Sequence, residues 1–135
     1  MTADQGDPIR PGKRERILLV DDDRSVLKVS QQMLTRLGYE VETETSGLVA
    51  LKAFQAAPDR FDLIITDEAI PGIKGTDLAR EMIKIRPGIP IIHYTGHEEE
   101  LPPEVLSWPG FRARIIKPVR LGVLAETVRE VLEQK

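Results

Sequence analysis

Short apolar runs alternate with amphipathic stretches along most of the chain. Compact apolar blocks, such as the Ile-Leu-Leu-Val that follows Arg16, are typical of strands buried on both faces. Apolar positions three and four residues apart predict helices, several of which end at glycine or before proline. Strands are predicted over residues 17–20, 39–45, 61–66, 89–94 and 114–116, and helices over 24–37, 46–57, 76–86 and 121–132. Only a short helix, around residues 104–108, fits among the prolines of the remaining stretch.

Five strands alternating with five helices predict βαβ units joined by right-handed crossovers. The expected fold is therefore α/β, a doubly wound five-stranded parallel sheet with helices on both faces. In such sheets, ligands bind beyond the carboxyl ends of the strands, near the point where the strand order reverses. Residues directly after each apolar block are therefore the candidates for a functional site.

The chain has 135 residues, the length of one domain of common size. Residues 1–15 hold glycine and proline among polar residues and show no apolar period, which predicts a flexible leader or linker. We expect the folded domain to cover residues 16–135.

Composition and charge exclude several classes of protein. No apolar run is long enough to cross a bilayer, and the first 15 residues lack the apolar segment of a signal peptide, so we expect a cytoplasmic protein without membrane contact. With no cysteine and two histidines, a zinc or thiolate site is not expected, and any metal should have oxygen ligands. The net charge of −3 and the scattered basic residues argue against direct nucleic acid binding.

Polar residues follow four of the predicted strands immediately. They are Asp21, Asp22 and Asp23 after the first strand, Asp67 after the third, Thr95 after the fourth and Lys117 after the fifth. In a parallel sheet these side chains converge at one edge. Two carboxylates about 4 Å apart repel by roughly 4 kcal/mol at an effective dielectric constant of about 20, so such a cluster needs a cation or bound protons.

This set of side chains predicts chemistry on a phosphoryl group. Oxygen ligands from few residues, with room left for water, suit Mg²⁺. Lys117 supplies a charge that binds phosphate, and Thr95 supplies a hydroxyl that can hydrogen-bond the same group. A carboxylate beside them is a candidate nucleophile toward phosphorus, forming an acyl phosphate. Taken singly, Asp22 or Asp23 is explained by a helix cap and Asp67 by a turn, whereas their joint order along four strand ends favours function.

These segments resemble the response regulator receiver family over roughly residues 16–133. The similarity lies in residues 17–23, in residues 62–67 with Pro71 and Gly75 following, in residues 90–96 and in residues 115–118. The resemblance implies a flavodoxin-like or CheY-like (βα)5 fold with strand order 2-1-3-4-5, and it makes residues 16–135 a receiver domain. The chain is also similar to receivers attached to hybrid histidine kinases.

By this resemblance Asp67 is the phosphoacceptor of a two-component system. Asp21 and Asp22 would hold Mg²⁺ together with Asp67 and the main-chain carbonyl of Ala69. The cofactor implied is therefore Mg²⁺ alone.

The resemblance also assigns the two remaining strand-end residues and the partners. Thr95 would be the switch hydroxyl that moves toward the phosphoryl oxygens, and Lys117 would pair with them. The donor would be a phosphohistidine of a sensor histidine kinase or of a histidine phosphotransfer protein. The domain, a monomer or weak dimer, would catalyse only its own phosphorylation and dephosphorylation, and its output would be a changed surface.

Several positions depart from the family pattern. Receivers usually carry Tyr or Phe three residues before the lysine, where this chain has Arg114, so the route from phosphate to surface is left open. Ala69 and His97 occupy positions that tune the lifetime of the acyl phosphate in this family. His93 lies within an apolar strand and is interpreted as packed there rather than as a ligand.

Other functions stay open at this point. A degenerate receiver, used only for protein interaction, is suggested by Arg114. A small haloacid-dehalogenase-type phosphatase would use Asp21 as nucleophile and Asp23 as general acid, but it gives Asp67 no role and lacks an acidic pair after the lysine. A dinucleotide-binding domain is disfavoured, because three aspartates follow the first strand where that fold has glycines.

Overall fold

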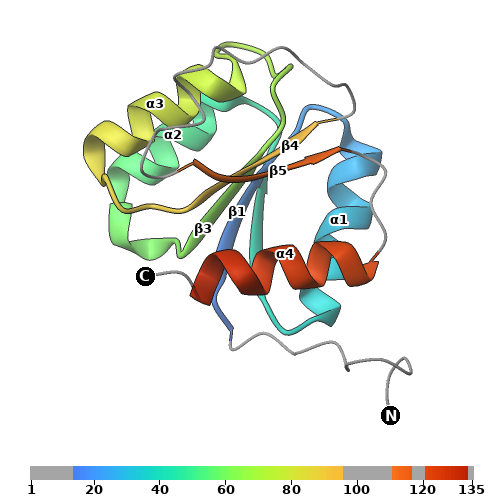
Figure 1. Ribbon diagram of the computed structural model, residues 1–135. Helices are drawn as coiled ribbons and strands as arrows, with labels where there is room; N and C mark the ends of the chain where they lie inside the picture. Colours follow the sequence, from blue (N-terminus) through green and yellow to red (C-terminus); the bar gives the residue numbers. More distant parts are fainter. Residues whose placement is uncertain (1–13, 96–110, 117–120, 134–135) are drawn as a thin grey trace.

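A computed structural model of the chain describes residues 14–95, 111–116 and 121–133, with the backbone alone at Thr95, Phe111, Arg112, Arg114 and Ile116 (Figure 1). The strands are β1 (Arg16–Val20), β2 (Glu40–Glu44), β3 (Leu63–Thr66), β4 (Ile91–Thr95) and β5 (Phe111–Ile116). The helices are α1 (Arg24–Arg36), α2 (Gly47–Ala56), α3 (Gly75–Ile85) and α4 (Leu121–Glu133). A 3-10 turn, η1 (Pro58–Arg60), follows α2.

The predicted elements that fall on these residues are all present, with small shifts at their ends. The strand predicted from residue 114 begins earlier, at Phe111. The turn η1 was not predicted; proline fits its first position, because its missing N–H has no partner to lose there. The predicted helix around residues 104–108 and residues 1–13 of the predicted leader, which was expected to cover residues 1–15, lie outside the described residues.

The five strands form one parallel sheet in the order β2-β1-β3-β4-β5, which confirms the predicted α/β architecture. The order reverses next to β1, between its neighbours β2 and β3. Val20 pairs with Glu44 on one side and with Thr66 on the other, so β1, β2 and β3 end at the same level. The residues that follow β1 and β3 are therefore brought together at one edge of the sheet.

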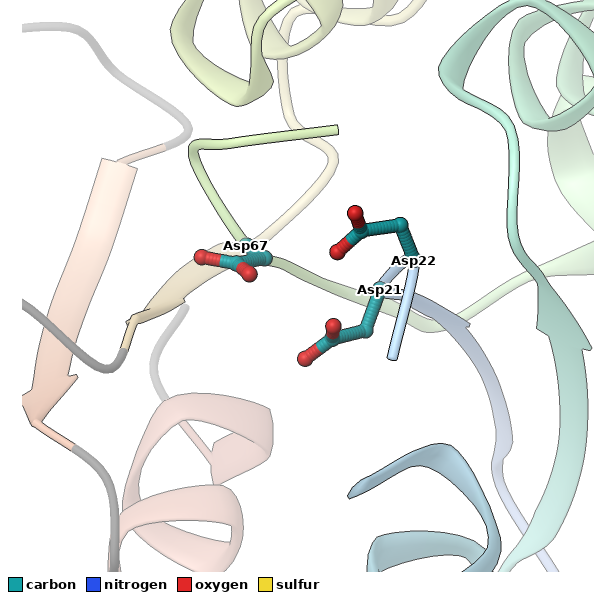
Figure 2. Close-up of side chains that lie close together, drawn as sticks. All are labelled: Asp21, Asp22 and Asp67. Carbon is teal, nitrogen blue, oxygen red and sulfur yellow. The ribbon is translucent and has the colours of Figure 1, made fainter. Parts of the chain in front are cut away.

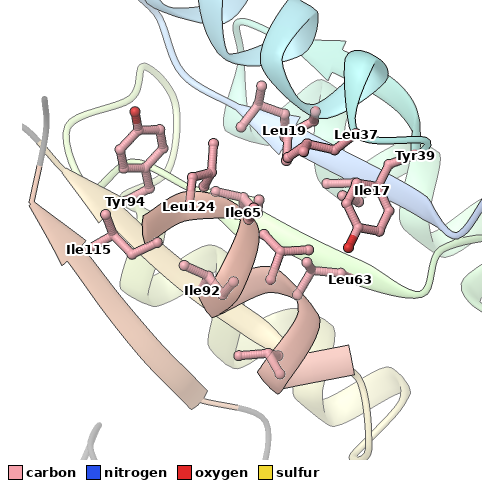
Figure 3. Close-up of a cluster of buried hydrophobic side chains, with 14 of the residues drawn as sticks. Ile17, Leu19, Leu37, Tyr39, Leu63, Ile65, Ile92, Tyr94, Ile115 and Leu124 are labelled. Carbon is pink, nitrogen blue, oxygen red and sulfur yellow. The ribbon is translucent and has the colours of Figure 1, made fainter. Parts of the chain in front are cut away.

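Helices cover both faces of the sheet, α1 and α4 on one side and α2 and α3 on the other (Figure 1). Strand residues alternate between the two faces, so Ile17 and Leu19 face one helical layer while Leu18 and Val20 face the other. Figure 3 shows the core on the side of α1 and α4, where Leu124 of α4 packs among side chains of the central strands. This double burial explains why the central strands are apolar at nearly every position.

An ion pair links the start of the described chain to the last helix. The guanidinium of Arg129 in α4, which is almost fully buried, lies 2.6 Å from the carboxylate of Glu15, just before β1. The aromatic ring of Tyr39 packs against the same guanidinium, with 6.0 Å between the ring centroid and Cζ of Arg129. The first strand and the last helix are thus fastened to each other.

None of the helices in the described residues is both long and apolar enough to cross a membrane.

We expect Phe54→Ala to lower the free energy of unfolding by about 3–5 kcal/mol, because it leaves a large cavity in the core under α2. Phe54 is fully buried and stacks on Phe61, with ring centroids 6.4 Å apart. Val49→Ala, at a position of the same helix that is 49% exposed, should change stability by less than about 0.5 kcal/mol. Urea denaturation measures both, and equal losses would contradict the proposed core.

Candidate functional site

The site lies at the carboxyl ends of β1 and β3, where the sheet order reverses. Asp21 follows β1 directly, and its main-chain N–H donates to the carbonyl of Glu44. Asp67 follows β3, and its N–H donates to the carbonyl of Val20, at 2.9 Å. The backbone ladder therefore extends one residue past the strands and fixes where both aspartates start.

Three carboxylates meet at this edge. Oxygen atoms of Asp21, Asp22 and Asp67 all lie within 4.8 Å of one another. Figure 2 shows the three side chains gathered around one space in front of the strand ends. Asp21 is 2% exposed and Asp67 is 8% exposed, whereas Asp22 is exposed to solvent. The structure thus brings together three of the residues that the sequence predicted to meet.

The donor set fits a small hard cation. Each pair of charges at this spacing repels by roughly 4 kcal/mol if the effective dielectric constant is about 20, and a divalent cation between them reverses the sign of that energy. All three donors are carboxylate oxygens, and the exposure of Asp22 leaves room for water in the coordination sphere. Such a set, oxygen-rich and open to water, is the type that suits Mg²⁺.

The third aspartate of the run has a different part. Asp23 is the N-cap of α1, and its Oδ1 accepts hydrogen bonds from the N–H groups of Ser25 and Val26, at 2.9 and 3.2 Å. Its own N–H donates to Oδ1 of Asp21, at 2.9 Å. The helix-cap interpretation is therefore confirmed for Asp23. Asp21 and Asp22 instead lie close to the carboxylate of Asp67.

The Asp67 carboxylate is held by the backbone of the next residue. The N–H of Glu68 donates to its Oδ1, with 2.7 Å between nitrogen and oxygen. The carbonyl of Asp67 accepts from the hydroxyl of Thr66, at 2.9 Å. Ala69 lies in the same loop and is exposed, and its carbonyl stays a predicted metal ligand. The phosphoacceptor candidate is thus oriented by short contacts within its own segment.

Gly75, the first residue of α3, is packed against this segment. A methyl group built on Gly75 would lie 2.0 Å from the carbonyl oxygen of Asp67 and 3.0 Å from the Cα of Glu68. The N–H of Gly75 donates to the carbonyl of Glu68, at 3.0 Å. Glycine is therefore required for the close approach of α3 to the Asp67 backbone, and not for an unusual φ angle.

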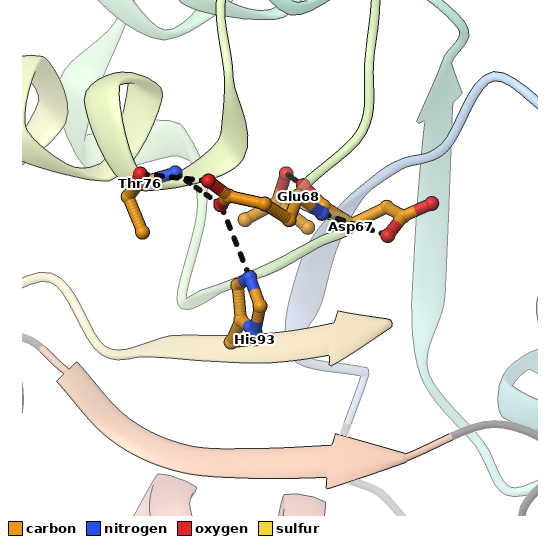
Figure 4. Close-up of polar contacts among 5 residues, drawn as sticks. Asp67, Glu68, Thr76 and His93 are labelled. Carbon is orange, nitrogen blue, oxygen red and sulfur yellow. Dashed lines mark hydrogen bonds and ion pairs between the residues drawn. The ribbon is translucent and has the colours of Figure 1, made fainter. Parts of the chain in front are cut away.

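A second polar group lies next to this segment, and the sequence analysis did not predict it. The carboxylate of Glu68 accepts from the N–H and the hydroxyl of Thr76, at 2.9 and 3.0 Å, and lies 3.2 Å from Nε2 of His93 (Figure 4). Burial raises the pKa of Glu68, but the hydrogen bonds from His93 and Thr76 outweigh burial and leave that pKa below its usual value. His93 is buried within β4, as expected, but it is also one side of a polar pair.

One sequence signal for this pair exists, but it needs the strand register. A histidine in an apolar strand requires a polar partner when it is buried. His93 is paired in register with Thr66 of β3, and Glu68 comes two residues later, in the bend that follows the strand. The register between β3 and β4 is a tertiary property, so the spacing along the chain alone did not identify the partner.

The side chains of the two remaining predicted site residues lie outside the described residues. Thr95 is the last residue of β4, and its side chain lies outside what is described, as does the whole of Lys117. Their roles stay predictions. Arg114 lies in β5 and is paired in register with His93, and its side chain is not described either.

The known proteins similar to this chain include response regulators and sensor kinases. The model of the response regulator receiver domain family matches residues 17–129. The chain is 33% identical over 122 residues to the transcriptional regulatory protein GlrR of Escherichia coli K12, and 31% identical over 119 residues to the sensor kinase CckA of Brucella abortus. These alignments cover 90% and 88% of this chain, but only 27% and 13% of the two relatives.

Solved structures of receiver domains share the fold of this chain. A CheY-like receiver domain protein of Methanospirillum hungatei has a TM-score of 0.80 and 34% identity, with 88% of this chain and 94% of that chain covered. The response regulator protein TrrA of Thermotoga maritima, solved in complex with Mg²⁺ and BeF, has a TM-score of 0.78 and 29% identity, with 87% and 98% covered. The similarity in fold therefore extends over nearly all of each structure.

We expect Gly75→Ala to lower the free energy of unfolding by about 2–3 kcal/mol, because the new methyl group collides with backbone that cannot move aside. Gly122, near the start of α4, has no atom within 4 Å of an added methyl group and is the matched control. Gly122→Ala should leave stability unchanged or raise it by up to about 1 kcal/mol. Urea denaturation of the two variants checks this, and a Gly75→Ala protein as stable as the parent would refute the close approach.

Proposed function

Because this chain belongs to the response regulator receiver family, in which phosphoryl transfer to an aspartate is the standard function, we propose that it accepts a phosphoryl group on Asp67. The observation that carries the proposal is the meeting of three carboxylates from two adjacent strand ends, with two of them buried. Such a cluster is unfavourable for the fold alone and favourable around a cation. Membership of the family explains why these repelling carboxylates lie together, because such a cluster would hold the cation needed for phosphoryl transfer.

The proposed reaction is a single displacement at phosphorus. An oxygen of the Asp67 carboxylate attacks the phosphoryl group of a phosphohistidine, the P–N bond breaks as the new P–O bond forms, and imidazole leaves. The hydrogen bond from the N–H of Glu68 fixes one carboxylate oxygen of Asp67, so the nucleophile is oriented before the donor arrives. Water later attacks the phosphorus of the acyl phosphate, the bond between phosphorus and the Asp67 oxygen breaks, and the free carboxylate and inorganic phosphate are released.

The residues proposed to hold Mg²⁺ are Asp21, Asp22, Asp67 and the main-chain carbonyl of Ala69. When bound, the cation would neutralise charge that develops on the phosphoryl oxygens. Two further residues are assigned from the family pattern, Thr95 as the hydroxyl that moves toward the phosphoryl group and Lys117 as the cation that pairs with it.

We propose a sensor histidine kinase or a histidine phosphotransfer protein as the donor. The relatives include a transcriptional regulatory protein and a sensor kinase, and the matched segment is 27% of the first and 13% of the second. A receiver of a hybrid histidine kinase is therefore one context for this domain, and a response regulator is the other. In both, the domain acts as a signalling switch.

The phosphatase alternative loses support from the geometry of Asp23. That function needs Asp23 as a free general acid, whereas its Oδ1 accepts two main-chain N–H groups as the cap of α1. The degenerate receiver, an interaction module without phosphorylation, makes a different prediction in the experiments that follow.

We expect the protein to gain the mass of one phosphoryl group when incubated with acetyl phosphate and Mg²⁺, and Asp67→Asn to abolish this gain, because an amide is not a nucleophile toward phosphorus. Intact-protein mass spectrometry measures the product. Asp59→Asn, in the exposed turn η1, is the control and should be phosphorylated like the parent. Failure of the parent to bind beryllofluoride or to be phosphorylated would favour the degenerate receiver; turnover of a phosphate ester that is lost in Asp21→Asn would favour the phosphatase.

We expect Asp21→Asn to weaken Mg²⁺ binding by at least about tenfold, since changes even in the outer shell of a metal site reach that size. The same change should raise the melting temperature without Mg²⁺, because it removes a repelling charge. Isothermal titration calorimetry and thermal unfolding provide the two measurements. Asp23→Asn is the adjacent control: asparagine also caps helices well, so Mg²⁺ affinity should change by less than about threefold. Equal weakening in both variants would argue against Asp21 as a ligand.

A further inference from the structure

Glu68 connects three separate elements at the site. Its carboxylate binds the first turn of α3 through Thr76 and reaches β4 through His93 (Figure 4). The side chains of His93 and Glu68 are 1% and 14% exposed, so little water competes for their contact. Lys74, the N-cap residue of α3, makes no cap with its side chain, and Glu68 supplies the acceptor for the N–H of Thr76 instead.

The main chain of the same residue holds the phosphoacceptor candidate. The N–H of Glu68 donates to Oδ1 of Asp67, at 2.7 Å, which is short for this type of bond. The carbonyl of Glu68 accepts from the N–H groups of Ile70 and Gly75, at 3.1 and 3.0 Å. Every hydrogen-bonding group of Glu68 is therefore engaged, and the two peptide planes that meet at its Cα are each held by a hydrogen bond.

The side chain and the main-chain N–H of Glu68 point to opposite sides of the segment. Figure 4 shows its carboxylate turned toward Thr76 and His93, while the carboxylate of Asp67 points the other way. A change in the position of the Glu68 side chain would rotate the peptide that carries the N–H. Among these contacts, the one with His93 of β4 comes from outside the β3–α3 segment, so its loss leaves the Glu68 side chain held by Thr76 alone.

We propose that His93 and Glu68 are positioning residues for phosphoryl transfer: their buried contact fixes the Glu68 peptide, which in turn orients the Asp67 carboxylate. The inference rests on the proposed function of Asp67. It adds a fixed link between the phosphoacceptor segment and β4, the strand that ends at Thr95. Neither residue touches the phosphoryl group in this scheme.

The test compares His93→Leu, which removes the hydrogen-bonding ring, with His93→Gln, whose amide N–H can still reach the carboxylate. At saturating acetyl phosphate and Mg²⁺, we expect His93→Leu to slow phosphorylation by about tenfold, the scale of one hydrogen bond to a charged group. His93→Gln should stay within about threefold of the parent. The rate is measured by mass spectrometry well below each melting temperature.

A spectroscopic signature separates positioning from stability. The amide proton of Glu68 should resonate far downfield in the ¹H–¹⁵N spectrum of the parent, because it is bonded to a carboxylate at short distance. His93→Leu should move this resonance upfield. Glu15→Ala is the matched control, since Glu15 also forms a partly buried ion pair and is 18% exposed, but contacts Arg129 of α4 instead. It should lower the melting temperature while leaving the Glu68 resonance and the rate unchanged.

Glu68→Ala provides a second variant that leaves no unpaired carboxylate in the interior. It should slow phosphorylation at least as much as His93→Leu, because it also removes the contacts to Thr76, and the double variant should be no slower than Glu68→Ala, because His93 acts through Glu68. If His93→Leu does not fold, Glu68→Ala decides the question. Parental rates in the folded variants, or equal slowing in Glu15→Ala, would overturn the inference. If the parent itself is not phosphorylated on Asp67, the proposed function fails instead.

Discussion

The pairing of β1 with β3 is the constraint on which the site depends. The register that sets Val20 opposite Thr66 places Asp21 beside Asp67, whatever their charges prefer. Repulsion among the carboxylates favours separation of the strand ends, whereas burial of the central strands between two helical layers favours the closed sheet. The hydrophobic core therefore holds together carboxylates that repel one another. A bound cation would relieve this repulsion, so the fold favours cation binding at this edge.

The segment after β3 is held by close packing and by hydrogen bonds. Gly75 lets α3 approach the Asp67 carbonyl, and the carboxylate of Glu68 closes the other side against α3 and β4. Both features act on the backbone, so the acidic side chain is oriented without any ligand. Residues outside the carboxylate cluster thus share in shaping the site.

Most of the fold and half of the site follow from local patterns. Apolar periodicity located the strands and helices, and position after a strand identified Asp21, Asp22 and Asp67, because the ends of parallel strands meet by geometry. The contact between Glu68 and His93 joins residues 25 positions apart and depends on the register of β3 and β4, which periodicity does not contain. Likewise, Gly75 was noted as part of a family pattern, whereas its steric reason required the distance to the Asp67 carbonyl.

The ion pair between Glu15 and Arg129 ties the two sequence ends of the described fold together. Loss of Glu15 is costly, since it leaves the buried guanidinium with only the half-exposed carboxylate of Glu133, 3.3 Å away. A domain boundary drawn one residue too late, or a last helix cut by a turn, would therefore damage the opposite end of the chain. For anyone excising this unit or grafting it onto another protein, the first strand and the last helix have to travel as a pair.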